Sequence, residues 1–322
     1  MIDKLNIIFM GTPEFAVPSL QKLIEEPLFD IKAVYTQPDK PVGRKQILTA
    51  PPVKVLAESK GIPVFQPTKI RKNQELMEHL SSLSLDFIVV VAYGKILPQT
   101  ILDIPKKGCI NVHGSLLEQY RGAAPIQWAI ARGETVTGIT TMLMDAGMDT
   151  GDMLLKASTN IVQNDTTETL IKKLAPIGAD LLIKTLKGLI DKTLTPIKQD
   201  NSKATMAPII NKADGQIDWH KSAKDIFNLI RAFTPWPSAY TYLDSSVLKI
   251  SQASLIETGQ SRNYKPGQIV EINKNGITIS TGDGLLIINR VQLSGSKEMS
   301  ATDFARGHRL ETGFIFENSM MC

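Results

Sequence analysis

The chain has 322 residues, of which 43% are hydrophobic and 21% charged, a composition typical of a globular protein with apolar residues enough for two domain cores. Its formal net charge of +4 permits an anionic partner but does not require one, so a nucleic-acid site must be sought in local patches. Its 2 cysteines and 4 scattered histidines exclude a disulfide framework and give no metal-ligand spacing, so we expect no metal.

The sequence also lacks the signals of export or membrane insertion. No apolar run reaches the ~18 residues that a membrane span needs. The N-terminal residues lead almost at once into a strand pattern, with no signal-peptide or transit-peptide character. The low cysteine usage fits a reducing compartment. We therefore expect a cytoplasmic protein without membrane attachment, and a monomer.

The first half of the sequence alternates apolar runs with amphipathic stretches. Strands are expected over residues 5–10, 31–35, 62–65, 87–91, 109–113 and 138–144. Helices are expected over residues 16–25, 53–59, 74–83 and 125–131, with a long polar loop over 36–52. The run FIVVV at 87–91 is typical of a central strand covered on both faces. The alternation predicts an α/β fold with a Rossmann-like, mostly parallel twisted sheet and helices on both faces.

A capping-box-like start at Asp165, with Glu168 three positions later, predicts a helix that runs to about residue 189. We take this helix as the last element of a catalytic domain over residues 1–190. The polar, proline-containing stretch 191–208 is expected to be a linker.

The remaining residues, 209–322, have a different character. After a helix over 222–232 they read as short strands separated by turn signals at 275–276 and 282–284. That pattern predicts a small β-barrel as a second domain.

The candidate site lies at the end of the strand CINVH at 109–113. Side chains alternate along a strand, so Asn111 and His113 point to the same side where the strand meets a Gly-Ser loop. Asp149, in a glycine-flanked turn, could complete the group. An amide, an imidazole and a carboxylate suit attack on a carbonyl, because they can stabilise an oxyanion, carry a proton and favour the charged imidazole.

A purely structural interpretation remains open at this point. Asn111 and His113 could satisfy backbone groups at a strand end, and Asp149 could cap a turn. The first strand is followed by GTPEF, with one glycine where a dinucleotide-binding fold has GxGxxG, and the sequence has no Walker motif. A nicotinamide dehydrogenase and a P-loop enzyme are therefore disfavoured.

Basic residues gather in the loop over 36–52, which holds Lys40, Arg44 and Lys45. These side chains could form an ordinary solvated face. A long loop beside a site is also a candidate recognition element.

Over essentially its whole length, the chain resembles the methionyl-tRNA formyltransferase family. The matching stretches are IIFMGTPEFAVPSL at 7–20, YTQPDKPVGRK at 35–45, VVAYGKILP at 90–98, NVHGSLL at 111–117, YRGAAPIQWAI at 120–130, DAGMDTGDML at 145–154, GQIDW at 215–219 and IRAFTPWPSAY at 230–240. The NxH and DTGD motifs are common to formyltransferases and hydrolases that use 10-formyltetrahydrofolate. The other stretches narrow the acceptor to initiator methionyl-tRNA.

The resemblance implies transfer of a formyl group from 10-formyltetrahydrofolate to the amino group of methionyl-initiator tRNA, giving N-formylmethionyl-tRNA for translation initiation. The implied catalytic residues are Asn111, His113 and Asp149. The implied folate-binding residues are Ser115, Leu116, Leu117 and Glu118. The implied tRNA-binding residues are Lys40, Arg44 and Lys45, and the second domain is implied to be an OB-like tRNA-binding domain.

The sequence departs from the family pattern in two places. Glu118 and Gln119 stand where the family has a proline and a basic residue, and the loop around Arg44 is less basic than usual. Two other functions remain as alternatives: a formyltransferase that acts on an amino sugar linked to a nucleotide, and a non-catalytic RNA-binding module. The first would leave the basic loop without a role, and the second would leave Asn111, His113 and Asp149 idle.

Overall fold

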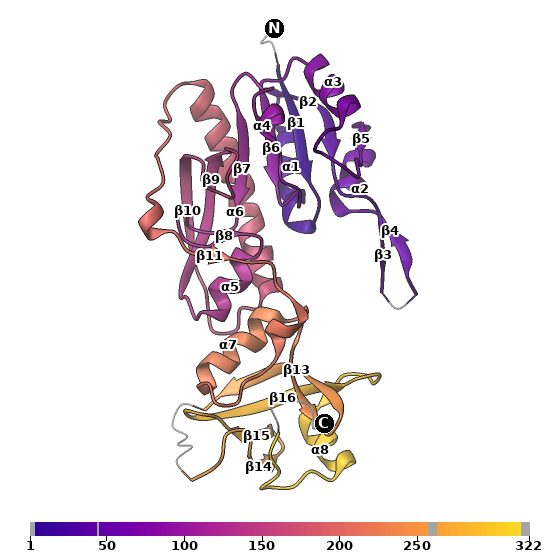
Figure 1. Ribbon diagram of the computed structural model, residues 1–322, viewed down its shortest axis with the longest axis vertical. Helices are drawn as coiled ribbons and strands as arrows, with labels where there is room; N and C mark the ends of the chain where they lie inside the picture. Colours follow the sequence, from indigo (N-terminus) through magenta and orange to yellow (C-terminus); the bar gives the residue numbers. More distant parts are fainter. Residues whose placement is uncertain (1–3, 44, 257–262, 317–322) are drawn as a thin grey trace. The chain divides into compact units, whose positions relative to one another are not determined.

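The structure is a computed structural model that describes residues 4–43, 45–256 and 263–316, and it divides into two compact units (Figure 1). Unit 1 comprises Met1–Pro125, Val136–Asn160 and Ile171–Pro208. Unit 2 comprises Ile126–Thr135, Ile161–Leu170 and Ile209–Cys322. Two short segments from the first half of the chain are thus part of unit 2, whereas the sequence led us to expect two continuous domains.

Unit 1 is built on a seven-stranded sheet with the order β10-β9-β7-β6-β1-β2-β5. Its strands are β1 (Leu5–Gly11), β2 (Phe29–Tyr35), β5 (Val64–Phe65), β6 (Phe87–Val91), β7 (Cys109–His113), β9 (Val136–Leu143) and β10 (Met153–Asn160). Neighbours from β5 to β7 pair in parallel, and β9 and β10 are antiparallel additions. This confirms the predicted mostly parallel sheet.

Helices cover both faces of this sheet. They are α1 (Val17–Glu25), α2 (Pro52–Ser59), α3 (Gln74–Ser82), α4 (Gln99–Leu102) and most of α6 (Thr167–Ile190). One face, with Ile88 and Cys109, packs in one apolar cluster with Leu80 of α3 and Ile101 of α4. The other face meets α6, where a Cβ on Gly178 would lie 3.0 Å from Val112. Because Val112 alternates with Asn111 and His113 along β7, the polar pair shares the face of Cys109.

Two stretches expected to lack regular structure contain strands. The expected loop over 36–52 forms a hairpin of β3 (Lys40–Val42) and β4 (Ile47–Thr49), which pair only with each other among the described residues. Within the expected linker over 191–208, β11 (Met206–Ala207) pairs in parallel with β8 (Arg121–Gly122). The stretch 191–208 is therefore packed into unit 1.

The start of α6 also differs in detail from the prediction. Thr166 and Thr169 cap it reciprocally, each hydroxyl accepting from the other's backbone N–H. Asp165 instead accepts from the backbone N–H of Val162. The helix was predicted correctly because threonine and aspartate both satisfy free N–H groups at a helix start.

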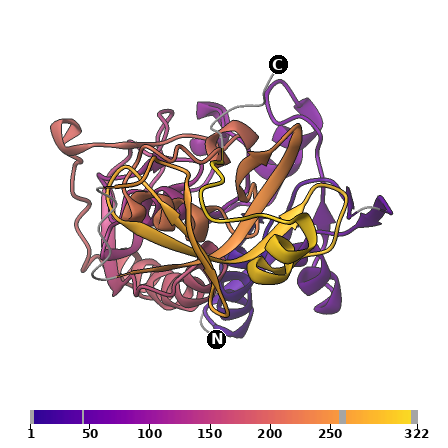
Figure 2. The same ribbon diagram turned by 90° about the horizontal axis from the view of Figure 1, so that it is seen from below.

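Unit 2 contains an antiparallel sheet of six strands. The strands are β12 (Ala239–Leu243), β13 (Ser246–Leu255), β14 (Ile269–Asn273), β15 (Gly276–Ser280), β16 (Leu285–Leu293) and β17 (Met299–Ser300). Its helices are α7 (Ala223–Phe233), α8 (Ala301–His308) and nearly all of α5 (Pro125–Ala131). The sheet and α8, in orange and yellow in Figure 2, share one core around the buried Trp219 and Phe304. The predicted helix followed by a set of short strands is confirmed, and closure of these strands as an OB-like barrel stays a prediction.

Among the described residues, short 3-10 turns also occur at Glu14–Ala16, Asn201–Lys203 and Lys212–Gly215. In the described part of the chain, every helix is too short or too polar to cross a lipid bilayer.

The buried Cys109 thiol tests the packing of the sheet. Burial, and secondarily the Asp103 carboxylate, raise the pKa of Cys109 to about 12. The thiolate is the reactive form, so folded protein carrying Cys322→Ser should resist iodoacetamide at pH 8. The same variant in denaturant should react fully. Mass spectrometry over time counts the alkylated thiols, and rapid alkylation of the folded variant at pH 8 would contradict the position of Cys109.

Candidate active site

The candidate site forms where β7 ends, at the junction between the parallel and antiparallel parts of the sheet. Asn111 pairs across to Met142 of β9, and His113 pairs to Thr140. Both side chains project from the same face of β7, and His113 is buried to 5% exposure. The carboxyl end of a parallel strand is where open α/β sheets usually place their ligands.

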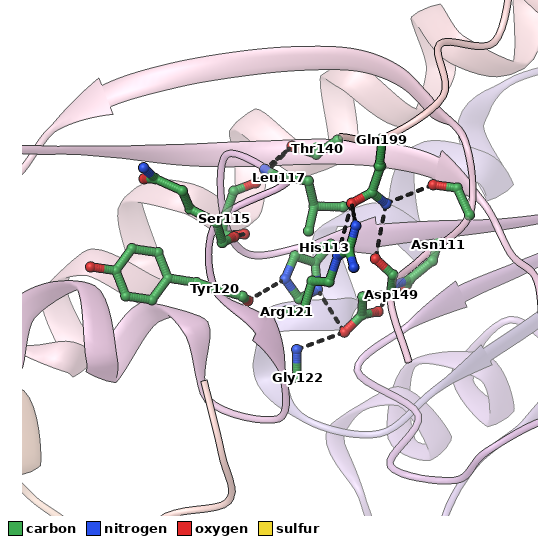
Figure 3. A network of polar contacts seen from close by, with 12 residues as sticks. Asn111, His113, Ser115, Leu117, Tyr120, Arg121, Gly122, Thr140, Asp149 and Gln199 are labelled. Carbon is green, nitrogen blue, oxygen red and sulfur yellow. Dashed lines mark hydrogen bonds and ion pairs between the residues drawn. The ribbon is translucent and has the colours of Figure 1, made fainter. Parts of the chain in front are cut away.

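The His113 ring lies between two acceptor oxygens (Figure 3). Its Nε2 is 2.9 Å from the backbone oxygen of Tyr120. A carbonyl oxygen can only accept, so Nε2 carries a proton and donates it. Its Nδ1 lies 3.7 Å from Oδ2 of Asp149. An acceptor oxygen therefore lies beside each nitrogen of the ring.

The Asp149 carboxylate joins three separate segments of unit 1. Its Oδ2 accepts from the backbone N–H of Gly122 at 2.8 Å, and its Oδ1 lies 3.4 Å from the amide nitrogen of Asn111. The carboxylate side chain is 17% exposed. The structure thus brings together Asn111, His113 and Asp149, the residues singled out from the sequence.

The backbone at two of these positions is unusual. Asp149 has φ of +53°, in the left-handed region that disfavours residues other than glycine. Gly122 has φ of +120°, and a Cβ there would lie 2.6 Å from the backbone oxygen of Ala207 in β11. A side chain at 122 would therefore push β11 away and disturb the N–H that holds Asp149.

The sequence analysis missed a buried amide behind the turn that holds Asp149. Gln199, in the stretch expected to be a linker, donates to the backbone oxygens of Asp149 and Gly151 and accepts from Arg121. A single glutamine in a polar stretch carries no signal of burial. Two long-range pairings bring it beside the site: the antiparallel bridge of Ile197 to Met153, and the pairing of β11 with β8.

The implied folate-binding segment is firmly held by its own backbone and by β9. The hydroxyl of Ser115 donates to the backbone oxygen of Gln119, and that of Thr140 donates to the backbone oxygen of Ser115. Leu117 is buried, its backbone N–H donates to Thr140, and its carbonyl accepts from Lys156. Leu116 and Glu118 are partly exposed. The segment therefore offers an ordered edge rather than a mobile loop.

The departure at Glu118 has a structural counterpart. The Glu118 carboxylate accepts from the backbone N–H of Asp200 at 2.8 Å. This contact turns the anion toward residues 200–205, where the Glu118 carbonyl also accepts from Thr205.

Two of the implied tRNA-binding residues, Lys40 and Lys45, lie on the β3–β4 hairpin, which extends from the sheet in Figure 1. Lys40 and Lys45 are exposed, and Arg44 lies outside the described residues. The hairpin also exposes Ile47 and Leu48, at 62% and 66%, a feature that the sequence analysis did not use.

The described residues contain no group of three or more His, Cys, Asp or Glu side chains that could hold a metal ion. The expectation of no metal remains a prediction.

Comparisons with protein families and with single relatives both point to formyltransferases. The family model described as "Formyl transferase" matches residues 4–186. The family model described as "Formyl transferase, C-terminal domain" matches residues 209–309. A methionyl-tRNA formyltransferase of Caldicellulosiruptor saccharolyticus is 51% identical over 97% of this chain and 99% of its own. One of Geobacter metallireducens is 52% identical over 96% of this chain and 97% of its own.

Solved structures show the same fold at low sequence identity. WlaRD, a sugar 3N-formyltransferase solved with dTDP and 5-N-formyl-THF, has a TM-score of 0.66 at 22% identity, covering 92% of this chain and all of its own. HypX of Aquifex aeolicus in complex with tetrahydrofolic acid has a TM-score of 0.64 at 14% identity, covering 96% of this chain and 48% of its own.

The close approach at Gly122 gives a stability prediction. Gly122→Ala should lower the free energy of unfolding of unit 1 by about 1–3 kcal/mol, because it adds both a clash with β11 and backbone strain. Gly61→Ala is the matched control, since Gly61 also has positive φ, +68°, but nothing within 4 Å. It should lose about 1 kcal/mol. Urea denaturation followed by circular dichroism compares the two, and equal losses would contradict the close approach.

Proposed function

This chain belongs to the methionyl-tRNA formyltransferase family, and on that basis we propose that it transfers the formyl group of 10-formyltetrahydrofolate to the amino group of methionyl-initiator tRNA. The observation that carries the proposal is the meeting of Asn111, His113 and Asp149 at the end of β7, in a chain about half identical to such enzymes over nearly its full length.

The reaction is an acyl transfer from one nitrogen to another. The neutral methionyl amine attacks the formyl carbon, forming a carbon–nitrogen bond and a tetrahedral oxyanion. The oxyanion then collapses, the bond from carbon to N10 of the folate breaks, and its electron pair stays on N10, which takes up a proton. The amine nitrogen loses a proton in the same sequence of steps.

The side chains of Asn111, His113 and Asp149 each suit one requirement of this reaction. The Asn111 amide carries two N–H groups, and only one of them faces Asp149, so the other can donate to the oxyanion. A charged His113, held between Asp149 and the Tyr120 carbonyl, supplies positive charge next to the developing negative charge. Asp149 balances that charge and can accept, through a water molecule, the proton that the amine loses.

The acceptor is favoured by the breadth of the similarity. WlaRD and a sugar N-formyltransferase from Shewanella share the fold at 22% and 19% identity, whereas two methionyl-tRNA formyltransferases match 96–97% of this chain at 47–52% identity. The sugar-acceptor alternative is therefore the weaker one. A purely RNA-binding module would leave Asn111, His113 and Asp149 without a chemical role.

The remaining roles complete the proposal. Residues 115–118, with Ser115, Leu116, Leu117 and Glu118, line the folate site, and the ordered backbone there supports this. Lys40, Arg44 and Lys45 contact the acceptor arm of the tRNA, aided by the OB-like unit 2. We propose a monomer that needs no metal, because the folate brings an activated formyl group. Its place is the cytoplasm, where initiator tRNA is charged and used.

Single-turnover transfer of labelled formyl groups tests the catalytic assignment. Asn111→Ala should slow transfer by about 10²–10³-fold, since it removes an oxyanion donor. His113→Ala and Asp149→Asn should each reduce the rate strongly, with little change in tRNA binding. Uncharged initiator tRNA and elongator methionyl-tRNA serve as controls for the wild-type enzyme. A near-normal rate in any variant would remove that residue from the reaction centre.

The salt dependence of tRNA binding tests the basic hairpin. Arg44→Ala should raise KM for methionyl-tRNA and reduce the slope of log affinity against log salt by about 0.7–0.9, because one phosphate contact is lost. Transfer at saturating tRNA should be unaffected. Lys60→Ala, which removes another exposed cation of unit 1, is the control. An unchanged slope for Arg44→Ala would mean that this residue is ordinary surface.

A further inference from the structure

Gln199 lies between the two stretches matched by the family descriptions, 4–186 and 209–309, yet it is buried beside the site at 6% exposure. Its amide makes four hydrogen bonds (Figure 3). The nitrogen donates to the backbone oxygens of Asp149, at 2.9 Å, and Gly151, at 2.6 Å. The oxygen accepts from Nε and Nη2 of Arg121, at 3.0 and 2.8 Å.

These contacts fix the orientation of the amide. A guanidinium group can only donate, so the Gln199 oxygen must face Arg121. Its nitrogen must then face the two carbonyl oxygens, which can only accept. Both N–H groups and both lone pairs of the amide are thereby used, and a rotated amide would lose all four bonds.

The two carbonyl groups belong to the turn that presents the Asp149 carboxylate. Asp149 adopts left-handed backbone there, which needs support from its surroundings. The opposite side of the turn is already confined, because a Cβ on Gly151 would lie 1.9 Å from the backbone oxygen of Leu143. Gln199 thus holds the turn from one side while β9 limits it on the other.

The residue type at 199 carries information as well. Arg121 is buried at 6% exposure, and its side chain donates to the amide oxygens of Gln199 and Asn201. Among the described residues, no carboxylate pairs with it. A glutamate at 199 would bind the guanidinium more strongly than an amide does. An amide is needed only if the side chain at 199 must also donate hydrogen bonds. The acceptors of these bonds are the backbone oxygens of residues 149 and 151.

We propose that Gln199 is a positioning residue that sets the Asp149 carboxylate against His113, and that Arg121 orients the Gln199 amide for this purpose. The inference deepens the proposed formyl transfer and rests on it for the role of Asp149. Gln199 touches neither substrate nor the reacting atoms in this scheme. It acts on the chemical step because misplacing a catalytic group by about 1 Å can cost about 10²-fold in rate.

Gln199→Glu separates the two contacts of this side chain. It keeps the length and strengthens the pairing with Arg121, but it replaces the NH2 group that donates both bonds with one oxygen that faces two carbonyl oxygens. We expect kcat for formyl transfer to fall by about 10–100-fold, with KM for folate and tRNA changed less than about threefold. Asn201→Asp is the matched control, because Asn201 accepts from the same guanidinium but has no bond to residues 149–151, and its kcat should stay near wild type.

A second readout follows the position of Asp149 without measuring activity. The backbone N–H of Gly122 donates to the Asp149 carboxylate, so its hydrogen exchange, measured by NMR, reports whether that carboxylate is in place. Exchange should accelerate in Gln199→Glu, approach that of Asp149→Ala, and stay slow in Asn201→Asp. Gln199→Met, of similar length, gives the same comparison if the glutamate variant does not fold.

The coupling between positions 149 and 199 gives the decisive outcome. If Gln199 acts through Asp149, Gln199→Glu should cost little in an Asp149→Asn background. An equal further loss in that background would overturn the proposal, as would wild-type exchange at Gly122 together with wild-type kcat. If exchange at Gly122 accelerates in Gln199→Glu while the wild-type protein transfers no formyl group, the positioning role is supported and only the proposed function is contradicted.

Discussion

The site depends on one carboxylate that holds its own turn against two distant strands of unit 1, β7 and β8. Asp149 accepts from the backbone of β8, lies beside the amide at the middle of β7 and faces the imidazole at the end of that strand. None of these partners is near it in sequence. Without an anion at this point, the N–H of Gly122 would lose its partner and His113 would lose the charge beside Nδ1. The geometry that suits acyl transfer therefore also explains why these loops pack as they do.

The sequence predicted the parallel sheet well because its strands are defined by local composition. FIVVV and CINVH became β6 and β7 with the expected bounds, since unbroken apolar runs have few alternatives to a covered strand. The edge strand β10 was not expected. Its exposed half alternates Lys156, Ser158 and Asn160 with partly buried residues, and such a polar pattern does not distinguish a strand from a loop.

The residues of the candidate site likewise fall into those that local sequence identifies and those that it does not. Asn111 and His113 could be chosen from the sequence because they share one face at the end of an otherwise apolar strand, and Asp149 because the resemblance to formyltransferases groups it with them. Gln199 and Thr140 could not, because their contribution comes from long-range contacts. The pairing of β11 with β8 joins residues about 85 positions apart in sequence, and no local sequence pattern predicts it. A polar stretch with prolines looks the same whether it links two domains or lies across an active site.

The buried cation at Arg121 shows how such a stretch can become part of a site. A guanidinium in a closed environment needs acceptors for its N–H groups, and here the neutral amides of Gln199 and Asn201 supply them. Meeting that need brings the chain back over β8 and places an amide nitrogen against the turn at 149–151. The strained backbone at Asp149 is then held by the Gln199 amide, and the charged guanidinium of Arg121 fixes the orientation of that amide. A structural requirement of one buried side chain thus becomes a means of placing another, and the reaction centre gains precision without any additional group that touches the substrate.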